Sequence, residues 1–200
     1  MSDAETTLPK QRLLTESARI FGEKGFAGAS VREICRAAET SSNMIHHYFG
    51  SKQGLYDAVL AKFSEQVFEV PMRMLQHVPD TSAAYAARLE IFFQESLVAL
   101  ISNRHIYEMV HRERLVVSSF ISYNQAFIAF LQAGKEKGLI RENLDAEMLT
   151  GLFLDRLGAQ IYYANPIREL SGGDILTDPV YQNRWIAANL DLFLNGAFER

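Results

Sequence analysis

The sequence is poor in the features that mark secreted and membrane-spanning proteins. It has a single cysteine, Cys35, so no disulfide can form within the chain, and this fits a reducing compartment. No apolar run approaches the roughly 20 residues that a membrane-spanning helix needs. The polar, acidic N-terminus has no signal-peptide core. We therefore predict a cytoplasmic protein with no membrane partner.

A basic charge excess is also missing. The chain has 20 Lys and Arg against 24 Asp and Glu, a formal net charge of −4 at pH 7. Residues 1–56 hold seven basic and six acidic side chains, so this part is nearly neutral. Overall charge therefore gives no sign of nucleic-acid binding, and any such function has to rest on local geometry.

Strand signals are nearly absent, whereas apolar residues recur at helical spacing along almost the whole chain. The pattern predicts an all-α protein in which a small module of short helices, residues 1–56, is joined to a bundle of longer helices, residues 57–200. We expect Gly25 to end the first helix, Pro71 to kink or end the fourth, and a loop from Pro166 to Pro179. The expected helices are 9–24, a short one after Ser30, 42–48, 52–75, 82–102, 104–112, 115–137, 145–164 and 184–198.

Residues 30–49 have the pattern of a helix-turn-helix. The apolar residues Val31, Ile34, Cys35 and Ala38 in the first helix, and Ile45, Tyr48 and Phe49 in the second, fall on one side of each helix. The residues left facing outward are Ser42, Asn43, His46 and His47. Such short, uncharged, hydrogen-bonding side chains can meet base edges and phosphates. We expect Ser41 to cap the second helix, whose N-terminus can bind a phosphate. The alternative is a purely structural module with His46 and His47 as surface residues.

Residues 10–63 also carry a longer series of motifs. These are Ala18-Arg19-Ile20-Phe21-Gly22-Glu23-Lys24-Gly25-Phe26, Ser30-Val31-Arg32-Glu33-Ile34, Ala37-Ala38, Ile45-His46-His47-Tyr48-Phe49 and Ser51-Lys52-Gln53-Gly54-Leu55. In this part the chain resembles the tetracycline-repressor (TetR) family. The resemblance implies a three-helix DNA-binding head, a variable ligand-binding bundle and a homodimer joined by its last two helices.

The resemblance also assigns roles position by position. Ser30, Ser41 and Lys52 match phosphate-contacting positions. Ser42, Asn43, Met44 and His47 match positions that face base edges, and His46 stands where the family usually has a tyrosine that touches the DNA backbone. Glu39 stands where the family commonly has the turn glycine. A glutamate there must either adopt a positive φ or reshape the turn.

The rest of the chain offers two groups of residues for binding a small molecule. One is a polar segment that includes Glu108 and Arg114, and the other is an aromatic stripe. The effector-binding residues that we predict are Phe92, His105, Tyr107, His111, Arg112, Phe120, Tyr123 and Phe127. The aromatic residues favour a flat or apolar effector, and the arginines allow it a carboxylate. The alternatives are a solvated helix face for the polar group and ordinary core packing for the aromatic group.

Two apolar stripes indicate a homodimer. Small or amphipathic residues share one face of 147–163, and the last helix is more apolar than a terminal surface helix should be. The predicted interface consists of Gly151, Asp155, Gly158, Ala159, Tyr162, Ile186, Leu190, Phe193, Leu194 and Ala197. Paired across a twofold axis, these helices form a four-helix bundle. The alternative is that both stripes are buried against their own chain.

Together these patterns favour a regulator that binds a palindromic double-stranded operator and is released from it by a small-molecule effector. Signalling is expected through the helix 52–75, the only element that continues from the head into the bundle, with a joint at Pro71. An effector-independent DNA-binding dimer and a transcriptional activator remain alternatives. An enzyme built on His105, Glu108 and His111 is a weaker one, because neither a nucleophile motif nor metal-ligand spacing supports it. We predict no cofactor and no metal.

Overall fold

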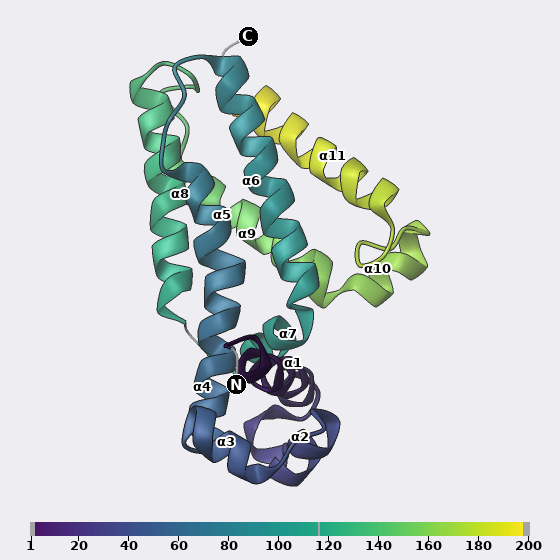
Figure 1. Ribbon diagram of the computed structural model, residues 1–200. Helices are drawn as coiled ribbons and strands as arrows, with labels where there is room; N and C mark the ends of the chain where they lie inside the picture. Colours follow the sequence, from purple (N-terminus) through teal and green to yellow (C-terminus); the bar gives the residue numbers. More distant parts are fainter. Residues whose placement is uncertain (1–2, 116, 198–200) are drawn as a thin grey trace. The chain divides into compact units, whose positions relative to one another are not determined.

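The computed structural model describes residues 3–115 and 117–197, with side chains from 8 to 115 and 117 to 192, and every regular element in these ranges is helical (Figure 1). None of the described helices is long and apolar enough to span a membrane. The α-helices are α1 (Asp3–Gly28), α2 (Val31–Ala37), α3 (Ser42–Phe49), α4 (Lys52–Ser64), α5 (Val70–Met72), α6 (Ser82–Ser102), α7 (Arg104–Arg112), α8 (Ser118–Glu136), α9 (Ala146–Tyr162), α10 (Ala164–Ser171) and α11 (Pro179–Ala197). A π-helical turn, η1 (Glu65–Glu69), and a 3₁₀ turn, η2 (Arg73–Leu75), flank α5.

The chain forms two compact units. The first contains α1 to α4 together with α7, and the second contains α5, α6 and α8 to α11. The chain thus leaves the first unit after Glu65, returns to it at Asn103 and leaves it again after α7. The all-α architecture with an N-terminal helix-turn-helix is confirmed. The functional boundary predicted after residue 56 stays a prediction.

The first unit is built around an apolar core shared by its N-terminal helices. Leu13, Phe21, Ile34, Ile45 and Leu55 are all buried there. The ring of Phe21 meets that of Tyr56 edge-on at 5.1 Å between centroids, a favourable arrangement for two aromatic rings. Burial of one apolar face per helix therefore orients α2 and α3 on α1 and α4.

The helix α7 packs closely on the C-terminal half of α1. A Cβ atom at Gly22 would lie 2.6 Å from the Cβ of His105, so only glycine permits this approach. Arg112 donates from Nη2 to the carbonyl oxygen of Gly22 at 2.9 Å. The carboxylate of Glu113 accepts from the Phe26 backbone N–H at 3.4 Å and from the Tyr56 hydroxyl at 3.1 Å. The segment after α6 is thereby part of the first unit.

Gly25 interrupts the helical geometry of α1 as the sequence predicts. Its φ of 71° and ψ of 176° are not helical, and a side chain there would also meet the Glu113 carboxylate. The helix begins earlier than predicted, at Asp3, so Pro9 lies inside it.

Residues 52–75 are helical throughout, as predicted, but the type of helix changes along this segment. The α-helix ends at Ser64, and the π-helical turn, α5 and the 3₁₀ turn follow in succession. Pro71 explains the break, because it lacks an N–H donor and its ring clashes with the carbonyl one turn upstream. The expected disruption is therefore real, but it starts six residues before the proline.

The second unit has an aromatic core. Phe92, Phe93, Phe127 and Phe153 are fully buried, and the rings of Phe93 and Phe153 stack at 4.1 Å between centroids. The helices α6 and α11 lie side by side in this unit (Figure 1). Tyr85 is also buried, and its ring stacks on Phe130 at 4.6 Å. These stacked rings account for the generous phenylalanine content of the chain.

The loop predicted from Pro166 to Pro179 is wrong in its first half, which forms α10. Pro166 is compatible with a helix there because it lies in the first turn, where its N–H would have no partner. Gly172 ends α10 in the left-handed conformation, with φ 70°. The last helix starts five residues before the prediction, at Pro179, after Asp178 accepts from the Val180 N–H at 2.9 Å.

Replacing Gly134 with alanine is expected to destabilise the second unit. A Cβ there would lie 2.6 Å from the Tyr85 hydroxyl oxygen, so the buried ring would have to move, at a cost of about 1–3 kcal/mol. Gln132→Ala on the same helix is the control, since Gln132 is exposed and alanine has the better helix propensity. Urea unfolding measures both, and equal stability of the two variants would contradict the packing.

The Tyr56 contact predicts a loss of stability in alkali. Burial and the neighbouring Glu113 carboxylate raise the pKa of Tyr56 to about 12, against about 10 in the unfolded chain. The neutral phenol therefore contributes fully below pH 10, and its contribution is lost as the pH rises through 12. In urea unfolding across this range, Tyr56→Phe should lose less stability than the wild type. The exposed Tyr163→Phe serves as control, and parallel profiles for wild type and Tyr56→Phe would contradict the assignment.

Candidate nucleic-acid interface

The helix-turn-helix starts from a well-formed cap. The Ser30 hydroxyl oxygen accepts from the Glu33 backbone N–H at 3.1 Å and thereby caps α2, as predicted. The Thr40 N–H donates to the Cys35 carbonyl at 2.9 Å and closes the end of α2. Ile45 is buried at the centre of α3. These contacts fix which face of α3 remains outside.

The turn between α2 and α3 has a strained residue. Glu39 adopts a φ of 51°, which is the first of the two outcomes expected for a glutamate at this position. Side chains other than glycine adopt this region at a cost. Its carboxylate accepts from Arg12 of α1 at 3.2 Å. The turn therefore keeps its geometry with a glutamate in place of a glycine.

The outer face of α3 consists of short polar side chains. Ser42, Asn43, His46 and His47 are exposed, and Met44 is half-buried. The Nδ1 atom of His46 bonds to the Gly50 carbonyl at 2.9 Å. Because a carbonyl only accepts, Nδ1 carries the proton, and Nε2 of the neutral ring is left as an acceptor. The face thus presents hydrogen-bond donors and acceptors and has no Lys, Arg, Asp or Glu side chain.

Ser41 occupies the N-cap position of α3 but makes no side-chain capping bond, contrary to the prediction. Its backbone is extended, with φ −104° and ψ 160°, which is the usual N-cap geometry. The first backbone N–H groups of α3 therefore receive no bond from this hydroxyl. Ser51 does cap α4, because its oxygen accepts from the Gly54 N–H at 3.1 Å.

Lys52 is engaged inside the first unit. Its ammonium donates to the Phe26 carbonyl at 2.5 Å and lies over the Phe26 ring, 4.4 Å from the centroid. The side chain is half-buried. Lys52 therefore holds α4 against the end of α1, and its predicted phosphate contact stays a prediction.

The residues predicted to bind an effector fall in different units. His105, Tyr107, His111 and Arg112 lie on α7 in the first unit, where Arg112 is bound to Gly22. The aromatic group lies in the second unit, where Phe92, Tyr123 and Phe127 are buried and Phe120 is partly exposed. The Phe92 ring lies 5.5 Å from that of Tyr123 and 4.8 Å from that of Phe127. These rings contact one another directly.

A polar pair lies inside this aromatic cluster. Ser96 donates to the Phe92 carbonyl at 2.7 Å, so its oxygen accepts from the Tyr123 hydroxyl, also at 2.7 Å. Burial raises the pKa of Tyr123 well above its ordinary value, which keeps the phenol neutral. The sequence did not point to Ser96, because a single serine in an apolar helix gives no signal.

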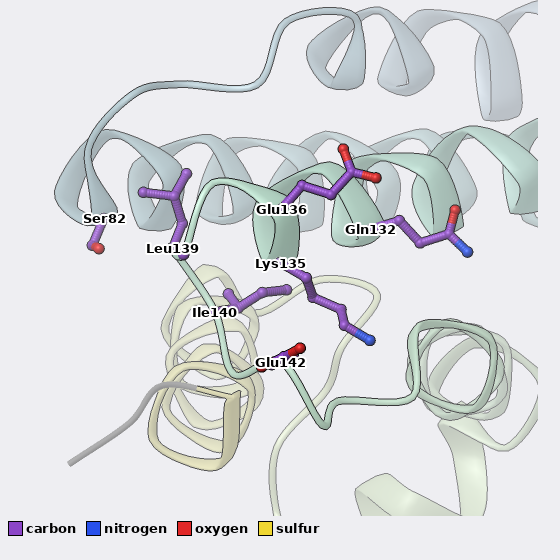
Figure 2. Close-up of a pocket in the computed structure, with 8 residues that line it drawn as sticks. Ser82, Gln132, Lys135, Glu136, Leu139, Ile140 and Glu142 are labelled. Atoms are coloured by element: carbon purple, nitrogen blue, oxygen red, sulfur yellow. The ribbon is translucent and has the colours of Figure 1, made fainter.

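An open pocket of about 930 Å³ lies where α8 ends and the chain turns towards α9 (Figure 2). Its lining consists of Ser82, Gln132, Lys135, Glu136, Gly138, Leu139, Ile140 and Glu142. Lys135 donates to the Leu144 carbonyl at 2.8 Å, which ties α8 to the following loop. None of the predicted effector-binding residues lines this pocket.

The predicted dimer residues divide into exposed and covered ones. On α9, Asp155 and Tyr162 are exposed, whereas Gly151, Gly158 and Ala159 are partly exposed. On α11, Ile186 and Leu190 are buried within their own chain. The side chains of Phe193, Leu194 and Ala197 lie outside the described ones. Met148 and Leu152, which the sequence analysis missed, are exposed and continue the α9 stripe at spacings of three and four.

Comparison with known proteins identifies the N-terminal region. Residues 13–59 match the family model of the bacterial regulatory proteins of the tetR family. The chain is 24% identical to the HTH-type transcriptional repressor KstR2 of Rhodococcus jostii over 178 residues, which cover 86% of this chain and 84% of the relative. It is 25% identical to the HTH-type transcriptional regulator UidR of Escherichia coli over 190 residues, covering 84% and 93%.

Solved structures agree with this fold across the chain. The ketosteroid transcriptional regulator KstR2 of Mycobacterium tuberculosis superposes with a TM-score of 0.72 at 19% identity, covering 96% of this chain and 95% of that one. FadR of Bacillus subtilis in complex with stearoyl-CoA has a TM-score of 0.65 at 16% identity, covering 93% and 98%. Each of these proteins is described as a transcriptional regulator or repressor. Residues 13–59 therefore match the tetR family, the chain has the fold of solved tetR-type regulators, and these similarities support a DNA-binding transcriptional regulator.

Proposed function

We propose that the chain is a repressor that binds a palindromic operator as a homodimer and is released by a small-molecule effector. The proposed binding to DNA rests on the exposed face of α3. This face consists of short polar side chains, those of Ser42, Asn43, His46 and His47. A face of this kind selects bases through hydrogen bonds. Ser30, Ser41 and Lys52 stand at the starts of α2, α3 and α4 as candidate phosphate contacts.

Asn43 provides the test of base reading. Sites selected from random DNA by the full chain should be imperfect inverted repeats with half-sites about one helical turn apart. Asn43→Ala should weaken binding to the selected site by about 1–3 kcal/mol and relax the preference at one base pair per half-site. Binding to unrelated DNA should remain unchanged. Fluorescence anisotropy with the selected and an unrelated duplex measures both.

A surface amide elsewhere gives the matched control. Asn143 is exposed in the loop before α9, and Asn143→Ala should leave both affinities at wild-type values. An equal loss on both duplexes in Asn43→Ala would contradict base reading by α3. An asymmetric site bound by a single chain would contradict the palindrome.

The proposed dimer rests on the exposed stripe of α9. Met148, Leu152, Asp155, Ala159 and Tyr162 recur at spacings of four, three, four and three, which keeps them on one helix face. Leu192 of α11 is exposed as well. Since Ile186 and Leu190 are covered by their own chain, we assign the contact chiefly to α9 and to the outer side of α11. Pairing of this stripe with a second copy removes the exposed apolar groups from water.

Leu152→Glu should separate the proposed dimer into monomers. Leu152 is 48% exposed, so a glutamate there is solvated in a single chain but is buried opposite an apolar face in a dimer. Ile121→Glu is the matched control, because Ile121 is 50% exposed on α8 and lies off the stripe. Sedimentation equilibrium should give a monomer for Leu152→Glu and a dimer for Ile121→Glu and wild type. A wild-type monomer, or a dimeric Leu152→Glu, would contradict the interface.

The effector is proposed to act on the aromatic core of the second unit. The buried hydroxyls of Ser96 and Tyr123 give this apolar cluster one polar group that a ligand could address. Two similar proteins are described as a ketosteroid regulator and as a complex with stearoyl-CoA, which favours a large apolar effector here too. The close ring contacts around Phe92 mean that such a ligand has to displace aromatic side chains on entry.

Three chain crossings between the units are available for signalling, where the sequence predicted a single connection. The chain passes between units at Glu65, within the π-helical turn, and again on both sides of α7. Movement of the end of α6 or the start of α8 is thus transmitted to α1 through the contacts of Arg112 and Glu113. A ligand that prefers the DNA-incompetent state shifts binding through these links.

A ligand panel separates an effector-dependent repressor from a constitutive one. Calorimetry with a ketosteroid, stearoyl-CoA and aromatic acids, with and without operator, should identify a ligand that binds more weakly when DNA is present. Phe127→Ala should alter that affinity. If a ligand binds equally with and without operator, coupling is absent. If the whole panel fails to bind, the close packing of Phe92 and Phe127 favours the effector-independent alternative.

A further inference from the structure

Three basic side chains of the DNA-binding unit, those of Arg12, Arg19 and Lys24, are paired with carboxylates of the same unit. Arg19 lies between Glu16 and Glu23, at 3.1 Å from each, and Lys24 bonds to Glu33 at 2.6 Å. The pairing with Lys24 lowers the pKa of Glu33. Part of the near-neutral charge of residues 1–56 therefore consists of basic and acidic side chains that pair at short range.

The pair formed by Arg12 and Glu39 differs from these. At 3.2 Å it is the longest of them, and its side chains are 50% and 80% exposed. An exposed ion pair contributes little, because water screens it and two long side chains lose freedom. Arg12 can therefore change partner at small cost.

The position of this pair is next to the recognition helix. Glu39 is in the turn, two residues before the N-cap Ser41, and its side chain brings Arg12 of α1 to that turn. When α3 enters a major groove, the DNA backbone passes its N-terminal end. A phosphate there offers Arg12 a bidentate acceptor that belongs to a dense row of negative charges.

We propose that Arg12 is a DNA-phosphate contact held in reserve by Glu39, so that Glu39 lowers the affinity of the head for all DNA. This inference rests on the proposed presentation of α3 to a major groove. In the wild type Glu39 competes with a backbone phosphate for Arg12 and stays close to the backbone as a negative charge, so the arginine adds little net neutralisation of phosphate. The sequence-independent part of the affinity is kept low, and discrimination is left to the polar face of α3.

The charge and the backbone strain of Glu39 can be tested separately. Glu39→Gln removes the charge and keeps the strained side chain, whereas Glu39→Gly removes both. Glu39→Gly should therefore raise Tm by about 2–4 °C over Glu39→Gln. If Tm is equal in the two variants, the strain assignment fails, but the binding measurements still decide the role of Arg12.

The binding experiment uses the full chain, a site selected from random DNA and an unrelated duplex of equal length, at salt concentrations from about 50 to 200 mM. Glu39→Gln and Glu39→Gly should bind both duplexes about threefold or more tightly. They should also steepen the dependence of log Kd on log salt by about one unit per subunit, since each freed arginine neutralises one phosphate.

Arg12→Ala completes a double-mutant cycle with Glu39→Gln. In Arg12→Ala/Glu39→Gln the gain in affinity and the steeper salt dependence should both disappear. An equal gain in the Arg12→Ala background would overturn the role of Arg12 and leave only a long-range effect of the Glu39 charge. An unchanged salt slope in Glu39→Gln, beside a wild type that selects a DNA sequence, would also overturn it. A wild type without any sequence preference would instead count against the proposed function.

Discussion

The close approach of α7 to α1 is the constraint on which the organisation of this chain depends. With no side chain at Gly22, the backbone of α1 comes within contact distance of His105. Arg112 then bonds to the Gly22 carbonyl, and Glu113 joins Phe26 to Tyr56. In the sequence α7 stands between α6 and α8, which belong to the second unit. These contacts nevertheless fix α7 in the DNA-binding unit. Any larger residue at position 22 would separate the helices, and these polar contacts would be lost together.

The sequence predicted the DNA-binding module well because its signals are local. The Ser30 cap, the Gly25 interruption and the positive φ of Glu39 each depend on the residue itself and a few neighbours. The α3 face followed from helical periodicity alone. Ser41 shows the limit of such reasoning, because its type and position fit a cap while its hydroxyl makes no capping bond. A side-chain rotamer depends on surroundings that spacing does not reveal.

Elements that depend on distant contacts were predicted less well. Periodicity continued through residues 52–75, yet the π-helical turn begins at Glu65, where Val67 and Phe68 are buried by other helices. Similarly, Ile186 and Leu190, which the apolar pattern placed at an interface, are buried within their own chain. An apolar stripe predicts that a helix face is buried, but it does not indicate whether the same chain or a second copy covers it. Membership of α7 in the first unit was equally invisible, since it arises from a contact between residues about 90 positions apart.

The polar pairs of the two units differ in their exposure to water. In the DNA-binding unit, charges are paired on the surface, where water weakens each pair and exchange with a phosphate is easy. In the second unit, the Ser96 and Tyr123 hydroxyls are buried among aromatic rings, where an unpaired hydroxyl is costly. A ligand that separates this pair has to supply a hydrogen-bonding partner of its own. In the proposed function, affinity for DNA would thus be tuned by weak, replaceable contacts, whereas an effector would have to satisfy a buried contact that is costly to leave unpaired.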